Sequence, residues 1–121
     1  MKEAWKIALD INDGVDFNQY QRLAQRTSNN KDPMDKLENG LMGLNGEAGE
    51  CIDVLKKHKF QGHELNIDKL VDELGDVLWY CAELAEGLGI PLAEVAEKNI
   101  EKLYKRFPKG FSAERSINRE V

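Results

Sequence analysis

The sequence has few cysteines and lacks any long hydrophobic run. Its 121 residues include two cysteines, Cys51 and Cys81, which is too few for a disulfide framework. No apolar stretch approaches the roughly 20 residues of a membrane span. The first twelve residues carry Glu3 and Asp10, where a signal peptide would need an uninterrupted apolar segment. We therefore expect a cytoplasmic protein without membrane contacts, with both cysteines as buried free thiols.

An overall surplus of positive charge is also missing. The formal net charge of -5 argues against broad binding to a nucleic-acid backbone. The charges are unevenly distributed, because residues 38–94 contain twelve acids and four bases whereas residues 98–119 contain seven bases and two acids. Carboxylates for a cation and, separately, cations for an anion would suit a metal–phosphate ligand. Ordinary solvated helix faces are the alternative explanation.

No segment alternates between apolar and polar residues as a strand would, and helical spacing dominates instead. Asp16 can cap a first helix that ends near residues 27–30. A second helix begins around Asp35 and fades near residues 57–59, and a third runs from a cap at Asn66 or Asp68 to about residue 87. A fourth starts near Pro91 and ends at about residue 107. The sequence therefore predicts an all-α, four-helix bundle-like domain over residues 1–121, with a polar C-terminal tail from about residue 108.

Two acidic strings stand out, Glu47-Ala48-Gly49-Glu50 and Glu73-Leu74-Gly75-Asp76. Each places two carboxylates three residues apart, so that both project from one face of a helix. At roughly 100° per residue, that face lies roughly 130° from the centre of the apolar stripe of its helix. We expect the stripes to pack inside the bundle. Their centres are Ala48 on the second helix and Leu74 with Cys81 on the third.

The matched glycines and acids predict a cation site. Gly49 and Gly75 each cost about 1 kcal/mol relative to alanine in a helix, and close approach of the two helices would explain them. Four carboxylates without histidine or cysteine favour Mg²⁺, or alternatively Mn²⁺, over zinc. A ferritin-like di-iron site would need Glu-x-x-His strings, which the sequence does not contain. A pair of solvated acidic faces remains the other interpretation.

A basic face follows on the fourth predicted helix. Asn99, Lys102 and Arg106 recur at helical spacing, away from Ile100 and Leu103. An amide and two cations in a row can hold phosphate oxygens, the arginine through two parallel hydrogen bonds. A solvated helix face is again the alternative.

Together these strings resemble the MazG-type all-α nucleotide pyrophosphohydrolases. The resemblance rests on GLNGEAGE (residues 43–50), DELGDVLWY (residues 72–80) and KNIEKLYKRFPKGF (residues 98–111), which lie in the order typical of that family. It implies a magnesium-dependent enzyme that cuts a nucleoside triphosphate to a monophosphate and pyrophosphate. It also implies a homodimer or homotetramer. In place of Asn45-Gly46 many members carry an additional acid, so the number of metal ions stays open.

The resemblance also implies roles for individual residues. Metal ligation falls on Glu47, Glu50, Glu73 and Asp76. A carboxylate that the metal does not fully engage can accept the proton of the attacking water, and we expect Glu47 or Glu50 in that role. Substrate contacts fall on Asn99, Lys102 and Arg106, and more weakly on Lys56. Two alternatives remain open. One is a specialised relative that acts on dUTP, dCTP or phosphoribosyl-ATP, and the other is a catalytically silent helical module that assembles partners.

Overall fold

The computed structural model describes residues 14–119, and helices dominate it. The helices are α2 (Phe17–Gln25), α3 (Pro33–Gln61), α4 (Ile67–Leu88), α5 (Leu92–Arg106) and α6 (Ala113–Ile117). No strand forms within residues 14–119, so the prediction of an all-α fold is confirmed. Within the same residues, none of the helices combines the length and the apolar character that crossing a membrane requires.

The predicted caps explain where the helices begin and end. The Asp16 carboxylate accepts the Gln19 amide N–H at 2.8 Å, and the Gln19 side chain accepts the Asp16 amide N–H at 2.9 Å, which together form a capping box for α2. Asn66 accepts a backbone N–H from the first turn of α4 at 3.0 Å. Gly62 and Gly89 end α3 and α4 with φ values of 73° and 71°, which glycine adopts without strain.

Two elements differ from the prediction. Helix α3 begins at Pro33, slightly earlier than expected, because Asp32 accepts a backbone N–H of the first turn at 2.8 Å and proline suits that turn. The predicted polar tail contains a short helix, α6, which Ser112 caps by accepting the Arg115 amide N–H at 3.3 Å. A five-residue helix is too short to produce a periodic apolar pattern, so α6 could not be predicted from periodicity.

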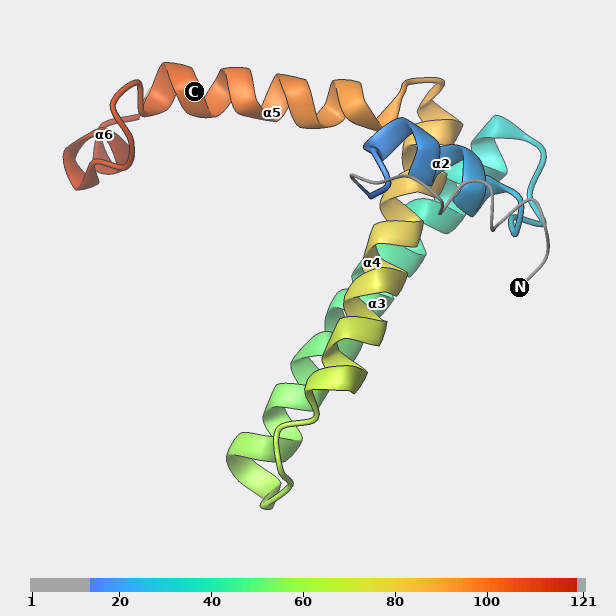
Figure 1. The fold of residues 1–121 in the computed structure, drawn as a ribbon, viewed down its shortest axis with the longest axis horizontal. Helices are drawn as coiled ribbons and strands as arrows, with labels where there is room; N and C mark the ends of the chain where they lie inside the picture. Colours follow the sequence, from blue (N-terminus) through green and yellow to red (C-terminus); the bar gives the residue numbers. More distant parts are fainter. Residues whose placement is uncertain (1–13, 120–121) are drawn as a thin grey trace.

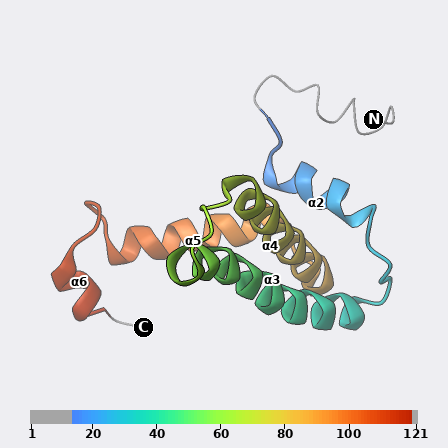
Figure 2. The same ribbon diagram turned by 90° about the horizontal axis from the view of Figure 1, so that it is seen from below.

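The helices form an open, L-shaped arrangement. Helices α3 and α4 run antiparallel as a long hairpin, and α2 lies across one end of it (Figure 1). Seen from below, α2 lies on the α4 side of the hairpin (Figure 2), in agreement with its contacts to α4. Helix α5 leaves this same end and extends away, with α6 at its far tip (Figure 1). The hairpin and the α5–α6 arm are therefore separate regions of the chain.

The apolar core of the described residues is small. Its buried members are Ala24, Ala82, Ala85 and Leu92, at the junction of α2, α4 and α5. Trp79 packs against this core, and its indole N–H donates to the Thr27 hydroxyl at 2.8 Å. A core of this size stabilises the hairpin at one end only.

A buried carboxylate reinforces this end of the hairpin. The side chain of Glu83 is 0% exposed, and Lys36 lies 3.5 Å from it. Burial alone would raise the pKa of Glu83, but hydrogen bonds outweigh burial and hold the pKa at about 2. The donors come from α2, α3 and the loop between them, and they are Asn30, Asn39, Gln25 and Ser28. These bonds connect three chain segments to α4.

The expectation that the apolar stripes pack inside the chain's own bundle is wrong. Ile52 is 66% exposed, Leu55 is 52% exposed and Leu74 is 61% exposed. The reason is that α3 turns Gly40 and Gly43 toward α4, and the stripe lies to one side of that contact. The expected free thiols are confirmed, although Cys51 and Cys81 are only half-buried.

Candidate metal centre

Small residues bring α3 and α4 into close contact. A Cβ atom added to Gly40 would lie 2.8 Å from the Cβ of Leu84, and one added to Gly43 would lie 2.1 Å from the Tyr80 ring. Real side chains do not approach so closely. Gly40 faces the Leu84 backbone and must stay glycine at this helix separation, whereas Gly43 leaves the space that the Tyr80 ring occupies. The separation places the residues of the next turn, including Glu47, directly opposite α4.

The predicted role of Gly49 and Gly75 is therefore wrong. A Cβ atom added at either position meets nothing within 4 Å, so neither glycine serves the contact between α3 and α4. The correct positions are Gly40 and Gly43, together with Gly87, whose added Cβ would lie 2.7 Å from the Leu37 amide nitrogen. The periodicity of glycine alone does not show which side of a helix faces its neighbour.

Three of the four predicted carboxylates converge across the hairpin. One oxygen each from Glu47 on α3 and from Glu73 and Asp76 on α4 lie within 4.8 Å of one another. Glu73 is buried, Glu47 is half-buried and Asp76 is exposed, so the group opens to solvent on one side. The three oxygens belong to two helices that the glycine contact holds in place.

Hydrogen bonding and repulsion between like charges change the pKa values of Glu47 and Glu73 in this group. A hydrogen bond to Glu73 is the largest cause that raises the pKa of Glu47, and the charges of Asp76, Glu73 and Glu50 raise it further. Lys69 lies 2.8 Å from Glu73, and its hydrogen bond is the largest cause that lowers the pKa of Glu73. Lys69 thus pairs with one of the three acids, and the neighbouring carboxylates make it easier to protonate Glu47.

Glu50 lies outside the three-oxygen group. It is exposed on α3, one turn beyond Glu47, and its charge helps to raise the pKa of both Glu47 and Lys69. Glu50 is therefore a neighbour of the group in this structure rather than a member of it.

Sequence reasoning missed two residues beside the group. Lys69 pairs with Glu73 from one helical turn away, a spacing that could have been recognised in the sequence. Tyr20 on α2 lies close enough to Asp76 for the carboxylate charge to add to the effect of burial, and both raise the pKa of the tyrosine. Because Tyr20 comes from a distant segment, no spacing rule could have placed it there.

The donor set fits a hard divalent cation. All three groups offer carboxylate oxygens, which Mg²⁺ and Mn²⁺ prefer over nitrogen or sulfur ligands. Six ligands at about 2.1 Å from Mg²⁺ lie about 3 to 4 Å apart, so oxygens within 4.8 Å need only small side-chain movements. The uncompensated negative charge described above also favours a cation.

The predicted substrate residues lie elsewhere in the chain. Lys102 and Arg106 line a recess between α5 and α6, whereas Asn99 is exposed on α5 and does not line it. Lys56 is exposed near the far end of α3, where its charge helps to lower the pKa of Asp53. Since α5 extends away from the hairpin (Figure 1), one chain does not bring Lys102 and Arg106 to the three carboxylates.

Comparison with known proteins links these regions to one family. The family model of the MazG nucleotide pyrophosphohydrolase domain matches residues 36–111, which include the acidic hairpin and most of the basic arm. The Gene 37 protein of Mycobacterium phage L5 is 40% identical over 83 residues, which are 65% of this chain and 73% of that protein. No solved structure gives a significant match.

Proposed function

The chain belongs to the MazG nucleotide pyrophosphohydrolase domain family, and on this premise we propose that it hydrolyses a nucleoside triphosphate to the monophosphate and pyrophosphate. The reaction would depend on Mg²⁺, with Mn²⁺ as an alternative. The observation that carries the proposal is the convergence of Glu47, Glu73 and Asp76 from two helices. A catalytically silent assembly module would not require three carboxylates to be held together against their repulsion.

Each predicted residue has a part in this proposal. Glu47, Glu73 and Asp76 would hold the cation, and Glu50 would join them or accept the proton of the attacking water. Glu50 suits proton transfer because it is exposed beside the group without belonging to it. Glu47 is the alternative base. A bound divalent cation would supply positive charge that neutralises the phosphate chain.

Phosphate oxygens would contact the basic residues predicted from the sequence. Arg106 can bind two oxygens at once, whereas Lys102 and Lys56 provide point charges and Asn99 provides an amide donor. The preferred base and sugar depend on contacts beyond the phosphates. An enzyme specialised for dUTP, dCTP or phosphoribosyl-ATP would therefore carry out the same proposed reaction on a narrower set of substrates.

The proposal is tested by pyrophosphate release from a panel of nucleotides in the presence of Mg²⁺. Asp76→Asn and Glu50→Gln should each lower kcat/KM by about 100-fold or more, because each removes a charge that acts on the reacting centre. Asp72→Asn is the matched control, since it removes an exposed acid of α4 outside the three-oxygen group. Near-normal turnover by Asp76→Asn, with unchanged helical circular dichroism, would refute the metal assignment.

We further propose that the active form is a homodimer or a homotetramer built on the exposed apolar face of the hairpin. This face is defined by one stripe on each helix, namely Leu41, Ala48, Ile52 and Leu55 on α3 and Ile67, Val71, Leu74 and Leu78 on α4. Helical geometry puts both stripes on the same side of the α3–α4 contact, opposite the side of Glu50 and Asp76. An apolar surface of this extent, next to so small a core, favours burial against a second copy.

Self-association would also explain how acids and cations meet. Because the arm points away from its own hairpin, Arg106 of one chain would serve the carboxylates of another. Leu74→Glu should shift the molar mass from light scattering toward the monomer. Met42→Glu should not, because Met42 is 72% exposed yet lies off the apolar face.

Mixing inactive variants tests the shared site directly. Asp76→Asn and Arg106→Ala chains, unfolded and refolded together, should recover part of the activity that each lacks alone. No recovery in a mixture that forms mixed oligomers would place both residues of a site in one chain.

A further inference from the structure

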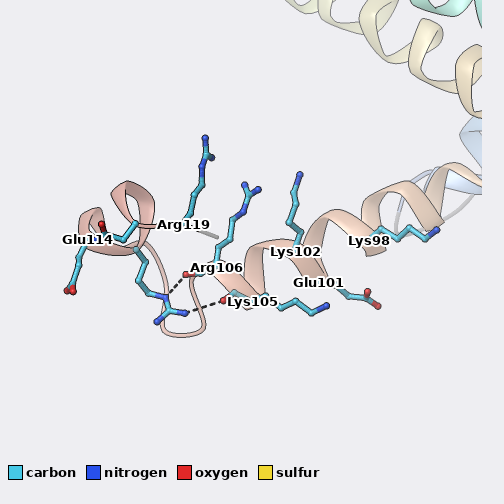
Figure 3. Close-up of a pocket in the computed structure, with 9 residues that line it drawn as sticks. Lys98, Glu101, Lys102, Lys105, Arg106, Glu114 and Arg119 are labelled. Carbon is cyan, nitrogen blue, oxygen red and sulfur yellow. Dashed lines mark hydrogen bonds between the residues drawn. The ribbon is translucent and has the colours of Figure 1, made fainter. Parts of the chain in front are cut away.

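The arm carries a cationic recess that extends beyond the predicted substrate residues. Helix α6 folds back toward the end of α5 and leaves a recess of about 680 Å³ between them (Figure 3). Six cations and two acids line it. The acids are Glu101 and Glu114, so the lining has an excess of positive charge.

Arg115 holds α6 in this position. Its Nε donates to the Arg106 carbonyl oxygen at 2.6 Å, and a terminal nitrogen donates to the Lys105 carbonyl oxygen at 3.3 Å (Figure 3). These carbonyls belong to the last turn of α5, which has no further helical N–H to bond, and a cation there is favourable. The Phe107 and Phe111 rings lie 5.5 Å apart and stabilise the turn between the two helices.

The returning tail brings a third cation to the predicted pair. The side chains of Lys102, Arg106 and Arg119 extend to the same side of the arm (Figure 3). Within residues 14–119 none of the three forms an ion pair, whereas Lys98 of the same recess pairs with Glu94 at 3.3 Å. Three neighbouring charges without a counterion repel one another, and a polyanion along them would relieve that repulsion.

We propose that Arg119 completes, with Lys102 and Arg106, a cationic row that binds the phosphate chain of the substrate, and that Arg115 is the positioning residue for this row. The inference rests on the proposed function and extends it to the tail. Arg115 and Arg119 lie beyond residues 36–111, so the match to the family does not assign them any role.

A short phosphate chain fits the row better than a nucleic acid does. The chain as a whole carries a net charge of -5, and the hairpin concentrates its acids. A long polyanion would extend past the three cations and meet this negative field. A triphosphate can neutralise the row without leaving the arm.

Arg119 is tested by calorimetric titration of the full chain with inorganic tripolyphosphate in metal-free buffer. Arg119→Ala should weaken binding by about 10-fold or more, because it removes a charge-assisted contact. Arg119→Lys should recover only part of the loss, since an ammonium cannot form the planar two-point contact. Lys109→Ala, which removes an exposed cation of the same arm outside the recess, should bind normally. Equal affinities of the wild type and Arg119→Ala would overturn the proposal.

Arg115 is tested by its dependence on Arg119. If Arg115 acts by positioning the tail, Arg115→Ala should weaken tripolyphosphate binding about as much as Arg119→Ala does. The double variant should then be little worse than either single variant. Arg115→Lys should restore part of the binding through one carbonyl contact. Independent, additive losses in the double variant would refute the positioning role.

These measurements separate the inference from the proposed function. Tripolyphosphate binding requires no turnover, so a wild type that binds through Arg119 but releases no pyrophosphate would refute the enzyme and support the row. If the wild type is an active enzyme and Arg119→Ala changes neither its KM nor its tripolyphosphate affinity, the enzyme is supported and the cationic row is refuted. Tighter binding of a single-stranded oligonucleotide than of tripolyphosphate would also overturn the assignment of the ligand.

Discussion

The α3–α4 pair carries two carboxylate sites, one at the end covered by α2 and one in the open middle of the hairpin. At the covered end, the single carboxylate of Glu83 accepts hydrogen bonds from four side chains and lies 3.5 Å from Lys36. In the middle, Glu47, Glu73 and Asp76 converge, and Lys69 pairs with Glu73 at 2.8 Å. The first site has an excess of donors and the second has an excess of negative charge.

This difference distinguishes a structural site from a candidate ligand-binding site more clearly than burial does. The Glu83 carboxylate is satisfied by the protein itself, so no ion is needed and its role is to join segments. In the open group, the neighbouring carboxylates raise the pKa of Glu47 and Lys69 lowers the pKa of Glu73, and a bound cation would relieve the repulsion. We therefore expect stability to depend on the first site and the response to metal to depend on the second.

The largest effect should come from removing the buried carboxylate. Glu83→Ala leaves Lys36 and several amide and hydroxyl donors without their acceptor, and it should lower the free energy of unfolding by roughly 3–5 kcal/mol. Urea unfolding without metal measures this change. Asp76→Asn under the same conditions should be neutral or slightly stabilising, because it relieves repulsion. Equal losses of unfolding free energy in the two variants would contradict the assignment of a structural role to the Glu83 site alone.

Acid should affect the Glu83 site in a defined pH range. The pKa of Glu83 falls from an ordinary 4.5 to about 2 on folding, so this group contributes roughly 3 kcal/mol of stability that is fully present above about pH 4.5. The contribution is lost as the pH falls toward 2. Unfolding of wild type and Glu83→Gln at pH 7 and at pH 2.5 should therefore show a smaller acid effect in the variant. Identical pH dependence would show that other groups control acid unfolding.

Metal should stabilise the protein through the open group alone. At a Mg²⁺ concentration of 100 times the Kd, binding adds about 2.7 kcal/mol to the folded state. Asp76→Asn should lose most of the resulting increase in Tm, measured against an EDTA reference, while Asp72→Asn should retain it. A full Mg²⁺ response in Asp76→Asn would mean that the ion binds elsewhere.

The smallest effects on stability should come from two glycines of α3, one inside and one outside the contact with α4. Gly43→Ala would place a methyl group 2.1 Å from the Tyr80 ring and should cost about 1–3 kcal/mol of stability. Gly49→Ala meets nothing within 4 Å and should stabilise the helix by up to about 1 kcal/mol. Thermal unfolding of both variants tests this pair. A destabilised Gly49→Ala chain would indicate a neighbour that a single chain does not provide.

Local chemistry explains why much of the fold was predictable. Asp16, Asn66, Gly62 and Gly89 mark helix boundaries through interactions within a few residues, so the sequence carries them directly. The two acidic strings were also predictable, because a spacing of three residues fixes which side chains share a helix face. Spacing could not reveal α6 or the hydrogen bonds to Glu83, since these depend on segments that meet only after folding.

The all-α character of the chain, the acidic faces of two of its helices and the basic face farther along all follow from local sequence. Helical periodicity sets these features, because each depends only on residues within a few turns. Three features depend on how the helices pack: α3 meets α4 through Gly40 and Gly43, three acids converge while Glu50 stays outside, and the apolar stripes remain exposed. The period of a single helix does not encode them, because close packing between distant residues sets the rotation of one helix against another.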